Sequence, residues 1–169
     1  MNAPSPTIHP APAFRPVGLV GAIILPGLGH VLVGERPRGL CIGAGILALF
    51  FGGIFIGGID VIDSREDPVW FYGQALVGPL AVGVDQLHQH HFKVIDPVSG
   101  VLRSAYPSEG RDPATRDATP NGTPPNRKSI GKMNEIGTLF ATIAGFINLI
   151  AIIDAAVPGP RARPASANA

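Results

Sequence analysis

The chain has 169 residues, of which 46% are hydrophobic and 15% are charged, and its mean hydropathy is +0.28. Soluble domains carry roughly a quarter charged residues, so this composition argues against an ordinary soluble enzyme. The net charge is only +1, which excludes nucleic acid as an expected partner. The composition instead indicates the lipid bilayer as the partner.

The first half of the chain predicts a helical hairpin in a membrane. Residues 1–16 are rich in Pro and Ala, so we expect a disordered tail there. Residues 17–33 are apolar and just long enough to cross a bilayer, and no small-x-small cleavage site follows, which favours a retained span over a signal peptide. A second predicted helix covers residues 39–62, and the short connection between the two leaves room only for a tight turn.

Two further apolar runs complete a predicted set of four transmembrane helices. Residues 69–84 are short for a span and contain Gln74 and Pro79, so a re-entrant segment is the alternative there. Residues 136–157 form the last predicted span, and a Pro-Gly-Pro sequence ends it before a second disordered tail at residues 158–169. The runs do not alternate polar and apolar residues, so we predict an all-α membrane protein rather than a barrel.

The segment between the third and fourth spans, residues 85–135, is expected to lie outside the membrane. Residues 92–102 have the pattern of a small hairpin, and from about residue 108 to residue 132 the polar, Pro-rich composition predicts disorder. Most basic residues lie after the first and third spans. The positive-inside rule therefore places both segments in the cytoplasm and both termini outside it.

Small residues spaced by four predict close helix packing. The pattern occurs at Gly39 with Gly43, at Gly53 with Gly57, and in the last span at Ala141 with Gly145. We favour packing within the chain, and the alternative is contact between copies in a homo-oligomer or with another membrane protein.

The most distinctive motif is Pro26-Gly27-Leu28-Gly29-His30. Proline removes a backbone donor and glycine removes side-chain bulk, so we expect the helix to bend or open here. A structural role for His30 is favoured, with a titrating or ligand-binding histidine as the alternative.

This motif, followed by Gly34, Arg38-Gly39 and a helix that ends near Asp60, resembles the hairpin of the small two-transmembrane-helix domain family. Residues 144–155 are similar to the closing helix of an uncharacterised bacterial membrane-protein family with the same first hairpin. The resemblance implies a membrane module and names no reaction. The Asp-Arg-Phe type turn of many two-helix domains is absent, so no role tied to that turn carries over.

Polar residues inside the predicted spans are candidates for function. Asn148 lies deep in the last span, where we expect it to bond to another helix, and Asp154 lies near the end of that span. Helix association is favoured over ion transport, because transport normally needs several inward-facing charges or matching broken helices.

One histidine-rich segment has metal-like spacing. On a helix, Asp85, His88 and His91 fall within one arc and are weak candidates for a zinc site. We favour the interpretation that these residues are the polar end of a helix where it leaves the membrane. We therefore predict no metal, no cofactor and no catalytic residues.

The sequence thus predicts a multi-pass integral membrane protein of the bacterial inner membrane with a structural or protein-interaction role. A small transporter or channel component that uses His30, Asn148 and Asp154 is the alternative. A metal-dependent membrane enzyme is a third hypothesis.

Overall fold

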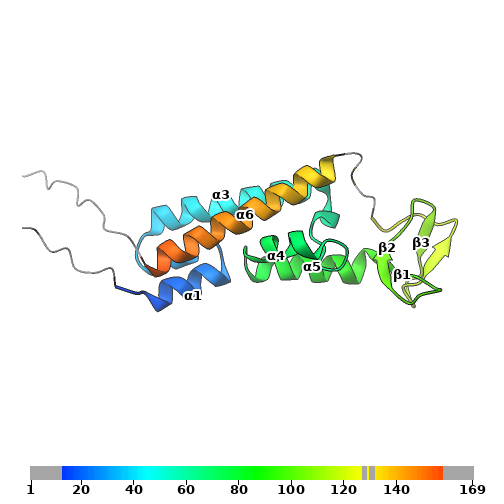
Figure 1. Ribbon diagram of the computed structural model, residues 1–169, viewed down its shortest axis with the longest axis horizontal. Coiled ribbons are helices and arrows are strands. Elements are labelled where there is room, and N and C mark those ends of the chain that lie inside the picture. Colours follow the sequence, from blue (N-terminus) through cyan, green and yellow to red (C-terminus); the bar gives the residue numbers. More distant parts are fainter. Residues whose placement is uncertain (1–12, 127–128, 130–131, 158–169) are drawn as a thin grey trace, which may run out of the picture.

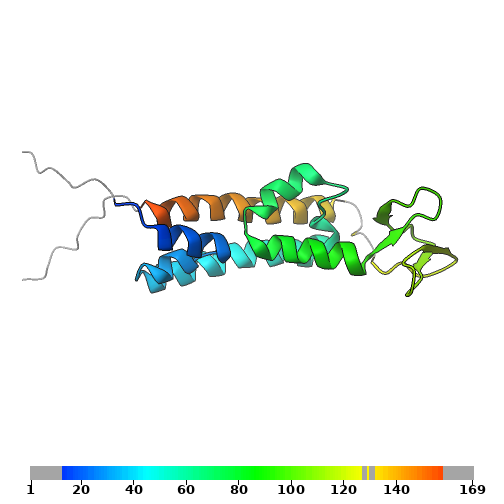
Figure 2. The same ribbon diagram turned by 90° about the horizontal axis from the view of Figure 1, so that it is seen from below.

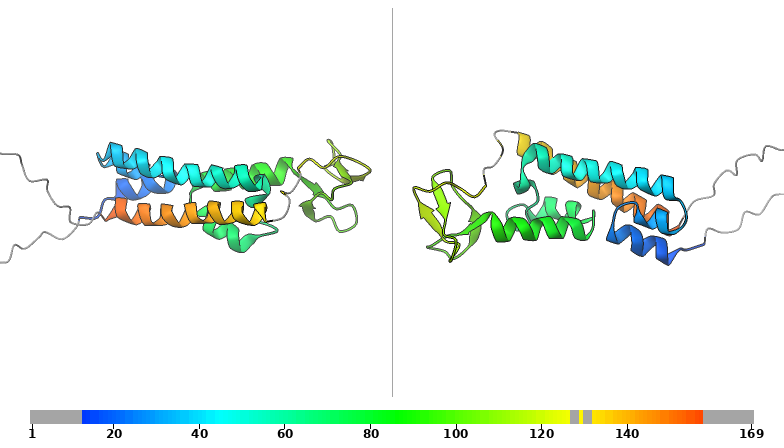
Figure 3. Two further views of the ribbon diagram at one scale, coloured as in Figure 1. Left: turned by 90° about the horizontal axis from the view of Figure 1, so that it is seen from above. Right: turned by 180° about the vertical axis from the view of Figure 1, so that it is seen from behind.

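The computed structural model describes residues 13–126, 129 and 132–157, and two long antiparallel helices form its axis. They are α3 (Arg36–Gly57) and α6 (Met133–Ala156), which lie side by side in Figures 1 and 3. Gly53 of α3 packs on the Gly137 carbonyl at one end of the pair, and Arg38 reaches Asp154 at the other. Both helices are long and apolar enough to cross a bilayer.

The predicted first span is instead a short helical hairpin. α1 (Pro16–Ile24) and α2 (Leu28–Leu32) run in opposite directions because the chain reverses between them. Pro26 cannot continue the hydrogen-bonded helix, and Gly27 has a φ of +81° with the Gly39 carbonyl 2.1 Å from where a Cβ would lie. The hairpin therefore covers only part of the length of α3.

The predicted third span is likewise two helices. After α3 and the 3₁₀ turn η1 (Ile59–Val61), the chain forms α4 (Pro68–Ala75) and α5 (Pro79–His91). Gly78 between them has a φ of +108°, and a Cβ there would lie 2.4 Å from the Ile23 carbonyl oxygen of α1. The tips of the two hairpins therefore meet, and Figure 2 shows the hairpins following one another along the α3–α6 pair.

This arrangement corrects the predicted topology. Because α1 and α2 form a returning hairpin, Arg15 and Arg38 lie at the same end of the bundle, where the Arg15 backbone N–H donates to the Ala156 carbonyl over 2.8 Å. We call this the terminus end. Residues 93–120 lie at the opposite end, the lobe end, instead of on the same side as Arg36 and Arg38 (Figure 1).

Beyond α5 the chain forms a small β lobe, where the sequence predicts one hairpin and then disorder. β1 (Lys93–Ile95) pairs antiparallel with β2 (Leu102–Ser104), and β3 (Glu109–Arg111) with β4 (Ala118–Pro120). Each hairpin turns on an Asp-Pro sequence: Asp96 Oδ1 accepts the backbone N–H groups of residues 98 and 99, and Asp112 Oδ1 those of residues 114 and 115. This local turn chemistry orders the second hairpin despite its polar composition.

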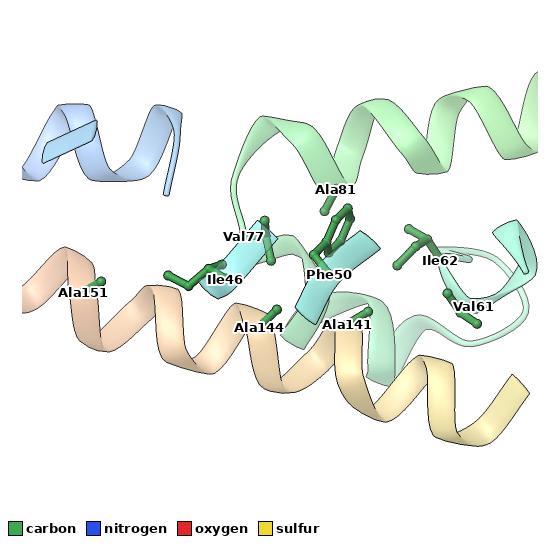
Figure 4. Close-up of a cluster of buried hydrophobic side chains, with 9 residues drawn as sticks. All are labelled: Ile46, Phe50, Val61, Ile62, Val77, Ala81, Ala141, Ala144 and Ala151. Carbon is green, nitrogen blue, oxygen red and sulfur yellow. The ribbon is translucent and has the colours of Figure 1, made fainter. Parts of the chain in front are cut away.

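The apolar core lies between the long helices and the second hairpin (Figure 4). Phe50 of α3, Val77 and Ala81 of the second hairpin, and Ala141 and Ala144 of α6 are fully buried there. Large apolar side chains also cover the outer faces of the long helices, and Phe55 is 87% exposed. The interior therefore holds many small residues, while bulky apolar residues face outward.

Candidate functional site

Buried polar side chains gather at the lobe end, where η1, the loop after it, α5 and β1 meet. We call this group the lobe-end cluster, and its members are Asp60, Asp63, Glu66, Asp85, His88, Gln89 and Lys93. All are buried except Glu66, whose side chain is 30% exposed. Charged side chains are rarely buried unless they are paired, so this cluster is the most unusual polar feature of the described chain.

Asp63 is the hub of the lobe-end cluster. Its Oδ1 accepts hydrogen bonds from the backbone N–H groups of Arg65 and Glu66 and from Gln89 Nε2, at 2.9–3.1 Å. Its Oδ2 contacts Lys93 Nζ. Burial raises the pKa of Asp63, but the Lys93 ammonium and these donors outweigh burial and lower the pKa below its usual range.

Lys93 has no solvent exposure and lies between two carboxylates. It contacts Asp63 on one side and donates to Glu66 Oε1 over 2.6 Å on the other. Glu66 also accepts from the Ser104 backbone N–H over 2.8 Å. Although burial raises the pKa of Glu66, the hydrogen bond from Lys93 and the Ser104 donors lower it to about 2. The ammonium thus joins the bundle to the β lobe.

His88 is oriented by the backbone. Its Nδ1 lies 3.0 Å from the Ile62 carbonyl oxygen, and because a carbonyl only accepts, Nδ1 carries the proton. Nε2 then points toward Asp60, whose Oδ1 is 3.5 Å away. One ligand atom each from Asp60, Asp63 and His88 lies within 4.8 Å of the other two.

The structure divides the predicted Asp85, His88 and His91 set. Asp85 and His88 lie on the buried face of α5, but His91 is exposed. Asp85 accepts from the Ser64 backbone N–H over 2.8 Å and from Ser64 Oγ over 2.7 Å, so it holds the loop after η1. His88 instead lies with Asp60 and Asp63, which sequence spacing within one helix does not identify.

A second polar group, the terminus-end cluster, surrounds His30. This histidine is fully buried, and its Nε2 lies 2.7 Å from Asp154 Oδ2. Arg38 Nη2 contacts the same oxygen over 2.7 Å, and Glu35 links Arg38 to Arg15. His30 and Asp154 were both predicted candidates, but their pairing spans the whole fold and leaves no local sequence signal.

The remaining predicted residues hold helices together. Asn148 Nδ2 donates to the Leu76 carbonyl over 2.9 Å, at the turn between α4 and α5. Gly39 and Gly43 pack on the Pro26–Gly27 backbone, Gly53 and Gly57 pack on α6, and Gly145 packs on the Gly73 carbonyl of α4. Gly34 has a φ of +93° in the loop before α3. The five predicted packing glycines thus face backbone within the same chain, and the predicted Ala141 is fully buried.

A groove of about 740 Å³ opens beside the lobe-end cluster and is lined partly by Glu66, Ser104 and Tyr106. Arg103 also lines it and is held by hydrogen bonds to Asp96 and Glu109, with its Cζ 4.3 Å from the Tyr106 ring centre. Ser104 Oγ lies 2.9 Å from Glu66 and 3.3 Å from Asp60. The groove therefore reaches the buried carboxylates through Ser104 and Glu66.

A family model covers this whole arrangement. It matches residues 17–168 and is described as a family of unknown function, DUF6677. The chain belongs to the DUF6677 family. This match confirms the expectation that the chain belongs to an uncharacterised family. The chain matches no curated protein and no solved structure.

Sequence reasoning missed Asp63 and Lys93 as members of a site. Both residues lie outside the predicted motif and outside the predicted spans. The signal was the density of carboxylates after the second apolar run, at positions 60, 63, 66 and 67, together with a lysine just beyond the histidine-rich segment. Only the return of α5 to η1 brings these segments together.

Proposed function

We propose that this DUF6677 protein is an integral membrane protein in which α3 and α6 cross the bilayer and hold the β lobe at one membrane surface. The main support is the position of the large apolar side chains, which face outward instead of inward. Leu40, Phe55 and Ile150 are 67–87% exposed, whereas glycines and alanines fill the contacts between helices. This distribution is favourable in a lipid bilayer, because helices in a bilayer associate through the close approach of small residues.

Helix length supports the same proposal. At a rise of 1.5 Å per residue, α3 is about 33 Å long, close to the ~30 Å hydrocarbon core of a bilayer. The two short hairpins then enter from opposite sides as re-entrant elements. Irregular backbone at such depth is tolerated only when protein satisfies it, and the bond from Asn148 to the Leu76 carbonyl supplies this at the α4–α5 turn.

The proposed role is structural or protein-interaction based. The bundle presents the β lobe and its groove, while glycine contacts and buried ion pairs fix the lobe's position on the helices. A module of this kind positions a surface for a membrane-protein or soluble partner without chemistry of its own.

Arginine substitutions at lipid-facing positions test the membrane proposal. Ala48 and Ile147 are exposed near the middle of α3 and α6, so in water an arginine at either site is harmless. In a bilayer each arginine costs about 2.5–3.5 kcal/mol on insertion scales. We expect Ala48→Arg and Ile147→Arg to reduce the protein recovered in membranes after alkaline extraction, and Val98→Arg in the lobe to leave it unchanged. Recovery of all three variants in the soluble fraction, like the wild type, contradicts the proposal.

A transporter or channel component is the second candidate, and the meeting of two broken helices beside Asn148 favours it. Such breaks mark substrate or ion sites in many transporters. Under this alternative, Asn148→Leu abolishes ion or proton flux in liposomes while the protein remains folded. Under the structural role, the wild-type protein gives no flux above empty liposomes.

A further inference from the structure

We propose that Asp60, Asp63 and His88 form a binding site for a divalent transition-metal ion, tested here as Zn²⁺, at the lobe end of the bundle. The three residues come from η1, the loop after η1 and α5, and each is at most 3% exposed. Their ligand atoms lie within 4.8 Å of one another, so a modest closure brings all three within coordinating distance of one ion.

The hydrogen bonding of His88 is the first observation that points to a cation. With Nδ1 donating to the Ile62 carbonyl, the ring turns Nε2 toward Asp60 Oδ1, which lies 3.5 Å away. A cation placed between these two atoms would be bound by both of them. Histidines that bind metals are oriented in this way, with the other ring nitrogen donating to a carbonyl or carboxylate.

Two buried amides give a second, independent observation. Gln89 Nε2 donates to Asp63 and to Asp85, so its amide contacts one of the three ligands directly. Gln74 Nε2 donates to the carbonyl of Val61, the residue after Asp60. Each of these glutamines has a buried Oε1 with no hydrogen-bond partner among the residues that the structure describes. Buried acceptors of this kind are normally satisfied, and the water ligands of a bound ion are suitable donors.

The donor set selects the class of metal. Two carboxylates and one imidazole suit Zn²⁺ and related first-row ions, whereas Mg²⁺ prefers oxygen ligands alone. Three protein ligands leave a coordination position open, and Ser104, which contacts Asp60, connects it to the groove. Lys93 competes for Asp63, but it retains Glu66 as an acceptor when the ion binds.

Metal titration of the purified full-length protein tests the site. After removal of metal with a chelator, we expect one equivalent of Zn²⁺ to bind the wild type and Mg²⁺ to bind at least 10-fold more weakly. His88→Ala should weaken Zn²⁺ binding at least 10-fold. His91→Ala is the matched control because His91 is exposed on the same helix, and it should bind Zn²⁺ like the wild type.

A wild-type measurement keeps the proposal testable if His88→Ala fails to fold. In ¹⁵N NMR of the histidine rings, Zn²⁺ should shift Nε2 of a single histidine whose Nδ1 stays protonated. The proposal is wrong if the wild type binds no stoichiometric Zn²⁺, if His88→Ala binds it equally well, or if no such ring signal moves. Each of these results means that Asp60, Asp63 and His88 do not hold the ion together.

Discussion

Both ends of the bundle contain paired charged side chains, but the two ends bury these side chains to different extents. At the lobe end, Lys93 and Asp63 are fully buried and depend on each other and on Glu66. In the terminus-end cluster His30 is buried, but its partner Asp154 and the neighbouring Arg38 have side chains that are 30% and 44% exposed. A buried ion pair is costly to break from one side, whereas an exposed pair contributes little. Removal of one charged partner should therefore lower the stability of the protein more at the lobe end than at the terminus end.

Replacement of Lys93 should give the largest decrease in the free energy of unfolding. Lys93→Met leaves Asp63 and Glu66 without their ammonium, and removal of one partner of a buried pair costs about 3–5 kcal/mol. The matched control is Arg65→Met, which removes the same charge from an exposed position of the neighbouring loop. Denaturant unfolding in detergent measures both. Equal stability of the two variants would show that the burial of Lys93 has no energetic consequence.

The glycine contacts between the two ends should give the next largest effect. In Gly145→Ala the new Cβ would lie 1.9 Å from the Gly73 carbonyl oxygen, so α4 and α6 must separate. Overpacking of this kind costs about 1–3 kcal/mol. A Cβ at Gly45 of α3 meets no atom of the described residues within 4 Å, so Gly45→Ala should be neutral or slightly stabilising. Thermal unfolding compares the pair, and a neutral Gly145→Ala contradicts the close packing of α4 on α6.

Substitution of a charged residue at the terminus end should lower stability only slightly. Asp154→Asn retains an oxygen that accepts from His30 and loses only the charge that faces Arg38. Because this pair is partly exposed, the expected loss is about 1 kcal/mol or less, and it should shrink as salt rises. The measurement is the unfolding midpoint at low and high ionic strength. A loss as large as that of Lys93→Met would remove the contrast between the two ends.

Acid should act on the β lobe before it acts on the long helices. The backbone N–H groups of residues 98 and 99 and the Arg103 guanidinium lower the pKa of Asp96, and Arg103 and the Tyr106 backbone lower that of Glu109. A folded pKa below the unfolded one gives stability that is present above the unfolded value and is lost as pH falls through the folded value. Hydrogen exchange should therefore increase in residues 93–120 below about pH 4, with α3 and α6 unchanged. Uniform exchange across both regions would contradict this.

The sequence predicts the long helices well because length, apolarity and glycine spacing are local properties. The boundaries 39–62 and 136–157 differ from α3 and α6 by only a few residues at most ends. A re-entrant segment was the stated alternative for residues 69–84, whereas the first short hairpin was predicted as a full span, because an apolar run of similar length can cross a bilayer or turn back within it. Pro26 and Gly27 marked a bend, but only contact with Gly39 and Gly43 fixes a full reversal.

The candidate site was less predictable than the fold. His88 and Asp60 were both singled out, yet their proximity depends on α5 returning to η1 after the turn at Gly78. The second β hairpin was also missed, although its Asp112-Pro113 turn repeats the Asp96-Pro97 turn of the first. Composition indicated disorder there, and the turn chemistry decided otherwise.

The most direct test of the account is the side of the membrane to which each loop belongs. Single cysteines at Phe14, Arg36, Ser64 and Val98, in a Cys41→Ala background, can be labelled in intact membranes with an impermeant maleimide. We predict that Phe14 and Arg36 label from one side, and that Ser64 and Val98 label from the other. Labelling of Phe14 and Arg36 from opposite sides, or of Ser64 and Val98 from opposite sides, would mean that a hairpin crosses the bilayer and would contradict the account.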